Sequence, residues 1–137
     1  MRQSHTGIWT HLVISTKNYQ PLFNEEWKKT IQTCLEDFVQ IFPDQHSIFC
    51  ILPDHIHFLI KLPDDMALST LVSQIKKVVS DRLSGKYGDI SNFAWEDDYH
   101  AHSVSVNRLS TEKNLIERQE IKHKEMSLQE ELKFFGM

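Results

Sequence analysis

Two histidines, His55 and His57, stand two residues apart inside a stretch, Leu52 to Ile60, that otherwise has the composition of a buried strand. On a β-strand, residues two apart point to the same face of the sheet. The two imidazoles are therefore expected to lie side by side, close enough to bind one divalent ion. A lone His-x-His pair is also common on a solvated sheet face. The apolar run 58–60 that follows favours a sheltered polar site instead.

The same alternation predicts which residues face the hydrophobic core. Leu59 is expected to share the face of the histidines, whereas Ile56, Phe58 and Ile60 point to the other side. A tight turn at Pro53-Asp54 leads into this strand. A further histidine, His11, lies in the first predicted strand, and for it a structural role and a functional role both stay open.

Length and composition limit the class of protein. With 137 residues, 40% hydrophobic and 25% charged, the chain predicts one soluble globular domain over residues 1–137. Cys34 and Cys50 form no Cys-x-x-Cys pair, which favours reduced thiols and a cytoplasmic location. No apolar run reaches the roughly 18 residues of a membrane span, so no membrane contact is expected. The net charge of −4 requires any nucleic-acid contact to use a local patch.

Strands are predicted from β-branched and aromatic residues between turn signals. The four predicted strands are 8–15, 47–52, the histidine strand and one within 99–107. In the last of these, Ala101, Ser103 and Ser105 alternate with His102, Val104 and Val106.

Helices are predicted from apolar residues at helical spacing. Asn24 is expected to cap the first helix. Ser69 is expected to cap the second helix, and Gly85 to end it. The third helix is expected to begin at Ser110 or Thr111 and to run through Gln119. The third helix has few apolar residues, so we expect it to lie over the sheet or a partner. A capping box at 127–130 predicts a last short helix, so that a helical tail spans about 110–137.

The order of strand, helix, strand, strand, helix, strand predicts an α+β fold. It is the ferredoxin-like split βαβ arrangement, an antiparallel sheet with helices on one face and extra C-terminal helices. Four cations gather on or after the second helix, where a solvated face and a nucleic-acid contact are about equally expected. They are Lys76, Lys77, Arg82 and Lys86.

Several motifs occur in the order found in one known family. They are 11–18 (HLVISTKN), 52–57 (LPDHIH), 93–95 (FAW), Tyr99, 103–105 (SVS) and the tail Gln119-x3-His123-x3-Ser127-x2-Glu130-Glu131. With these the chain resembles the single-tyrosine HUH transposases of bacterial insertion sequences (IS200-like) and the related REP-associated tyrosine transposases. The resemblance covers nearly the whole chain.

The resemblance implies a ferredoxin-like homodimer that acts on single-stranded DNA, often a hairpin, with a divalent metal ion, Mg²⁺ or Mn²⁺. His55 and His57 match the family's metal ligands, and Gln119 matches the third. The family's tyrosine nucleophile stands one helical turn before that glutamine, where this chain has Leu115. Leucine has no oxygen with which to attack phosphorus.

Two further departures lie near the fourth strand. Asp98 stands where relatives have glycine, and His100 replaces another small residue. The acidic run 96–98 suits a DNA phosphate poorly. We therefore expect a single-stranded DNA hairpin-binding protein that keeps the metal site and is defective in cleavage and strand transfer. Two alternatives stay open: an active nickase that uses another nucleophile, and an RNA-binding regulator.

Overall fold

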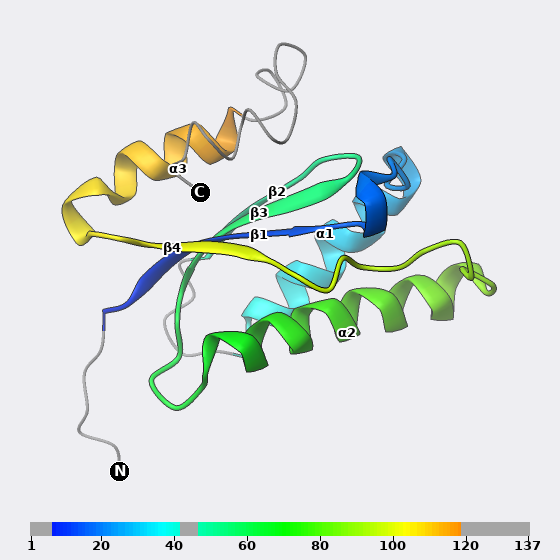
Figure 1. Cartoon of the computed structure of the whole chain (residues 1–137), viewed down its shortest axis with the longest axis horizontal. Coiled ribbons are helices and arrows are strands. Elements are labelled where there is room, and N and C mark those ends of the chain that lie inside the picture. The colour runs from blue at the N-terminus through cyan, green and yellow to red at the C-terminus, as the bar shows by residue number, and fades with distance from the viewer. Residues whose placement is uncertain (1–6, 42–46, 119–137) are drawn as a thin grey trace.

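The computed structural model describes residues 7–41 and 47–118, which form four strands and three α-helices (Figure 1). Two short 3-10 turns follow the first and last strands: η1 (Lys17–Tyr19) and η2 (Val106–Arg108). The remaining elements, in chain order, are β1 (Trp9–Ser15), α1 (Glu25–Val39), β2 (Ile48–Ile51), β3 (His55–Lys61), α2 (Leu68–Tyr87), β4 (His100–Val104) and α3 (Leu109–Glu117).

The strands form one antiparallel sheet in the order β2-β3-β1-β4. This order confirms the predicted split βαβ arrangement, in which β3 lies between the two strands that α1 connects. β1 is central and pairs with β3 along its whole length, from Trp9 opposite Lys61 to Ser15 opposite His55. Its other edge pairs with β4, where His11 lies opposite His102. His57 lies opposite Val13, two residues along β1 from His11, so the histidines of three strands share one face of the sheet.

The two faces of the sheet are covered by different helices. α1 and α2 lie on one side and α3 lies on the other (Figure 1). Ile56, Phe58 and Ile60 are buried in the core cluster with residues of α1 and α2, as the alternation predicts. Leu59 faces the opposite way and packs with Ile116 of α3.

The helix boundaries follow local capping and core contacts. The Asn24 side chain accepts a hydrogen bond from the Trp27 backbone N–H at 2.9 Å, so the predicted cap of α1 is confirmed. The prediction that Ser69 caps α2 is wrong, because the helix begins at Leu68, which packs against the core. Gly85 does not end it either. The helix continues to Tyr87, and Gly88 follows with a φ of 77°, a conformation that glycine adopts without strain.

α3 begins at Leu109, one residue before the predicted start, because Leu109 packs against the cluster of Leu59, Val104 and Ile116. Its continuation beyond residue 118 and the predicted helix near Ser127 lie outside the described residues. Cys34 is buried and Cys50 is half-buried. Within 7–41 and 47–118, no helix combines the length and the apolar character needed to cross a membrane.

Candidate metal centre

His55 and His57 are fully buried on the same face of β3. Their Nε2 atoms lie 3.2 Å apart. His55 Nδ1 lies 2.7 Å from Oδ1 of Asp54, the residue of the turn just before the strand. The predicted pair is therefore brought together, with one nitrogen of each ring facing the other ring and with the opposite side of His55 held by a carboxylate.

His11 connects this pair to two other elements. Its Nε2 lies 2.9 Å from His57 Nδ1, and its Nδ1 lies 2.7 Å from Oε1 of Glu112 on α3. His102, opposite His11 on β4, places its Nε2 2.9 Å from the same Glu112 oxygen. The result is a continuous chain of six polar side chains that runs from Asp54 to His102 across three strands and one helix.

The Glu112 carboxyl is buried but is held in its charged form. Burial is the largest single influence and raises its pKa, yet the hydrogen bonds and charges of His11 and His102 together bring the pKa below its ordinary value. The side chain is 7% exposed, so the two imidazoles are its principal polar surroundings. A carboxylate that is anionic at neutral pH results, and this is the form that binds cations.

Three ligating side chains converge at this end of the chain of contacts. His11, His102 and Glu112 each offer one ligand atom, and these atoms lie within 4.8 Å of one another. Two imidazole nitrogens and a carboxylate oxygen are donors typical of sites for zinc, manganese or iron. The described residues therefore provide, beside the His55–His57 pair, a second set of groups whose chemistry suits a metal ion.

The sequence predicted only part of this arrangement. It singled out His55 and His57 and left His11 open, but it did not identify His102 or Glu112 as site residues. Two signals were available: His102 alternates with the small residues of its strand, and Glu112 lies one helical turn before an apolar residue, Ile116. Gln119, the predicted third ligand, lies outside the described residues.

Leu115 is the residue that the family resemblance places at the position of the nucleophile, and this assignment stays a prediction. It is half-buried on α3, and the buried residues Glu112 and Ile116 mark the side of this helix that faces the sheet. Residues three apart lie on neighbouring parts of a helix surface. Position 115 is therefore close to the Glu112 side of α3.

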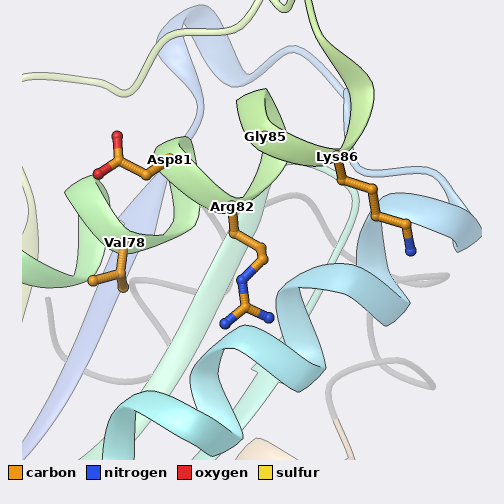
Figure 2. A pocket seen from close by; sticks show the side chains of 5 residues that line it. All are labelled: Val78, Asp81, Arg82, Gly85 and Lys86. Atoms are coloured by element: carbon orange, nitrogen blue, oxygen red, sulfur yellow. The ribbon is translucent and has the colours of Figure 1, made fainter.

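The four predicted DNA-binding cations lie on or near α2, which covers the other face of the sheet from the histidines. Figure 2 shows Arg82 and Lys86 extending toward α1 beside a shallow pocket. Each cation already donates to an oxygen: Lys76 to the Glu96 carbonyl at 2.7 Å, Lys77 to Asp81 at 2.9 Å, Arg82 to Asp37 at 3.3 Å and Lys86 to Thr30 at 3.3 Å. Their role in nucleic-acid binding stays a prediction.

Two solved structures share this fold at low sequence identity. One is a protein from Deinococcus radiodurans R1, provisionally assigned as a transposase. It has a TM-score of 0.65 and 17% identity, over 87% of this chain and 95% of that one. The other is a REP-associated tyrosine transposase bound to a REP hairpin, with a TM-score of 0.61 and 15% identity, over 90% of this chain and 74% of that one.

No curated protein is found to match the chain in sequence. The family comparison is decisive instead, because the sequence model of the family described as "Transposase IS200 like" matches residues 4–119, which is most of the 137 residues. The motif order and the sheet topology agree with this match. The chain belongs to the family of IS200-like transposases.

Proposed function

We propose that this protein binds single-stranded DNA, in the form of a hairpin, and holds a divalent metal ion between His55 and His57. We further propose that it does not cleave DNA through a tyrosine on α3, because Leu115 stands at that position. Membership of the transposase family supports DNA binding in general. The single-stranded substrate, the metal ligands and the loss of cleavage are our inferences.

The observation that carries the metal proposal is the separation of 3.2 Å between His55 Nε2 and His57 Nε2. When His55 Nδ1–H donates to Asp54, and His57 Nδ1–H donates to His11, both Nε2 atoms present lone pairs to each other. Two lone pairs repel unless something electron-poor lies between them. Partners on the far side of ligating imidazoles also fix ring orientation and raise ligand basicity. This pattern of contacts suits a metal-binding pair.

A divalent ion bound there would supply polarisation of a DNA phosphate. The chain's own residues then have separate tasks. His55 and His57 would hold the ion, Asp54 and His11 fix the orientation of their rings, and Glu112 balances charge at the far end of the chain of contacts. Imidazole nitrogens favour Mn²⁺ or Zn²⁺ over Mg²⁺, which prefers oxygen ligands.

All three tyrosines of the chain lie in the described residues, and none is on α3. Tyr87 and Tyr99 pack against the core cluster on the side of α1 and α2. Tyr19 is 41% exposed in η1. Thr16, the residue that precedes η1, donates a hydrogen bond to the Asp54 carbonyl. This position beside the histidine turn makes Tyr19 the residue for a second candidate function, nicking of DNA by a different tyrosine.

We also propose that the protein is a homodimer joined through β4. This strand is an edge of the sheet, and its outer side has no strand partner among the described elements. Unpaired edge strands are ready templates for pairing with another chain. Sedimentation at micromolar concentration is expected to give twice the mass of one chain, 16.1 kDa. A monomer over that concentration range contradicts this proposal.

Filter binding with labelled single strands tests the DNA proposal. We expect a hairpin-forming strand to bind in the presence of Mn²⁺, an unstructured strand of equal length to bind more weakly, and affinity to fall as salt is raised, because phosphate contacts release counterions. An RNA hairpin of matched sequence serves as the comparison. Tighter binding of the RNA supports the RNA-binding alternative, and no affinity for any strand sinks the nucleic-acid proposal.

The same assay tests the cations on α2. Replacing Lys77 and Lys86 with glutamine is expected to weaken binding about equally for all sequences, as loss of phosphate contacts does. Lys29→Gln on α1 is the matched control. Denaturing gels of the same mixtures detect nicking, and product that disappears in Tyr19→Phe would establish the second candidate function.

A further inference from the structure

His11, His102 and Glu112 come from three different elements and meet on one side of the sheet. Their ligand atoms lie within 4.8 Å of one another, and nitrogens of both histidines contact the same Glu112 oxygen, at 2.7 and 2.9 Å. We propose that these three side chains bind a divalent transition-metal ion of their own, which fastens α3 to β1 and β4. This site is additional to the His55–His57 pair and goes beyond the function proposed above.

The donor set matches zinc, cobalt, manganese or iron better than magnesium, since two of its three donors are imidazole nitrogens. At a tetrahedral zinc centre with bonds of about 2.0–2.2 Å, neighbouring ligand atoms lie about 3.3 Å apart. The observed separations are hydrogen-bond distances, so an ion requires the carboxylate to withdraw by roughly half an ångström. His102 Nδ1 has no hydrogen-bond partner among the described residues, so coordination through His102 disturbs only its contact with Glu112.

Burial and charge also suit an ion at this place. His11 is fully buried and Glu112 is nearly so, while the His102 side chain is 27% exposed and leaves a route from solvent. A buried carboxylate requires a positive partner, because an unpaired buried charge is strongly destabilising. Either protonated histidines or a metal ion can meet this requirement. The competing explanation is therefore a plain ion pair, and the experiment must separate the two.

The two sites use different atoms. The first uses the Nε2 atoms of His55 and His57, whereas the second uses His11 through the nitrogen that faces Glu112. His11 Nε2 contacts His57 Nδ1 and thus fixes the His11 ring from behind. No ligand atom is shared, but the hydrogen bond between His11 and His57 couples the two sites. His57 Nδ1–H donates to His11 when the His55–His57 pair binds an ion, whereas His11 Nε2–H donates to His57 when His11 binds an ion through Nδ1. The two sites therefore fill alternatively, and either one can be removed while the other is kept. A single substitution at His55 or at Glu112 therefore tests each site separately.

The test is titration of the metal-free full chain with Co²⁺ and Zn²⁺. It counts bound ions per chain, follows the visible absorption of Co²⁺ and records thermal unfolding. We expect one ion per chain in the unmodified protein, because the two sites exclude each other, and still one in His55→Ala. In His55→Ala, Zn²⁺ is still expected to raise Tm, and adding Glu112→Gln is expected to weaken the remaining site at least about 10-fold and to abolish that rise.

Glu117→Gln, an exposed carboxylate on the same helix, is the matched control and should leave both sites intact. If Glu112→Gln fails to fold, His102→Ala at the half-exposed strand position replaces it. The proposal is overturned if His55→Ala binds no ion and its Tm does not respond to Zn²⁺, which is the result for a plain ion pair. That outcome leaves the His55–His57 proposal standing. If His55→Ala keeps one ion and the double variant with Glu112→Gln loses it, the result supports the second site alone.

Discussion

Leu115→Tyr is expected to form a covalent adduct with hairpin DNA where the unmodified protein forms none. Position 115 lies on α3 beside the buried, sheet-facing residues Glu112 and Ile116. A tyrosine oxygen there is proposed to reach a phosphate held at His55 and His57. The new bond joins that oxygen to phosphorus, the bond from phosphorus to the 3′ oxygen breaks, and the tyrosine proton passes to the departing 3′ oxygen, which becomes a hydroxyl. A 5′-phosphotyrosyl link results.

The measurement is a denaturing gel of protein incubated with labelled hairpin DNA and Mn²⁺. Leu115→Phe is the control for side-chain size, because it adds the ring without the hydroxyl. Repeating the assay with Tyr19→Phe in addition shows whether an adduct depends on position 115. Absence of any adduct, while DNA and metal still bind, would mean that more than the nucleophile has been lost from the site.

Replacing both His55 and His57 with alanine is expected to remove Mn²⁺ binding at this pair, with a loss of at least about 100-fold, since losing even an outer partner of a metal ligand costs roughly 10- to 100-fold. The comparison is best made in a Glu112→Gln background, where the pair alone contributes. Isothermal titration gives the affinity directly. Circular dichroism must show that both variants are folded, because each substitution leaves space in a fully buried region.

His100→Ala is the matched control for this experiment. His100 stands on the same face of β4 as His102 but outside the chain of contacts described above, so its removal should leave Mn²⁺ affinity unchanged. Equal affinities in the double variant and the control would move the metal site elsewhere in the molecule.

Local patterns predicted the fold well because they are local in origin. The period of two in β3 put its histidines and its core residues on opposite faces, and the Asn24 cap is a contact over three residues. The start of α2 was mispredicted because a core contact of Leu68 extends the helix past the cap that the sequence suggests. Tertiary packing routinely overrides such local signals.

The candidate site was predicted only where it is local. His55 and His57 are neighbours in sequence, whereas His11 and Glu112 are 101 residues apart. Their contact depends on the register of β4 against β1 and on the face to which α3 docks. Neither can be derived from periodicity alone, which is why His102 and Glu112 were missed while both nearby histidines were found.

The alignment of His11 opposite His102 has a consequence for how the chain folds. A slip of one residue between β1 and β4 turns every side chain of β4 to the opposite face, and His102 would then enter the apolar core. His11 is also separated along the sequence from its partners His57 and Glu112 by 46 and 101 residues. These contacts therefore form only after two long loops have closed. Closing such loops is slow, because their entropy is lost before any contact compensates. The strand pairings of β1 close the same loops, so the polar contacts can form only together with a sheet assembled in its correct register.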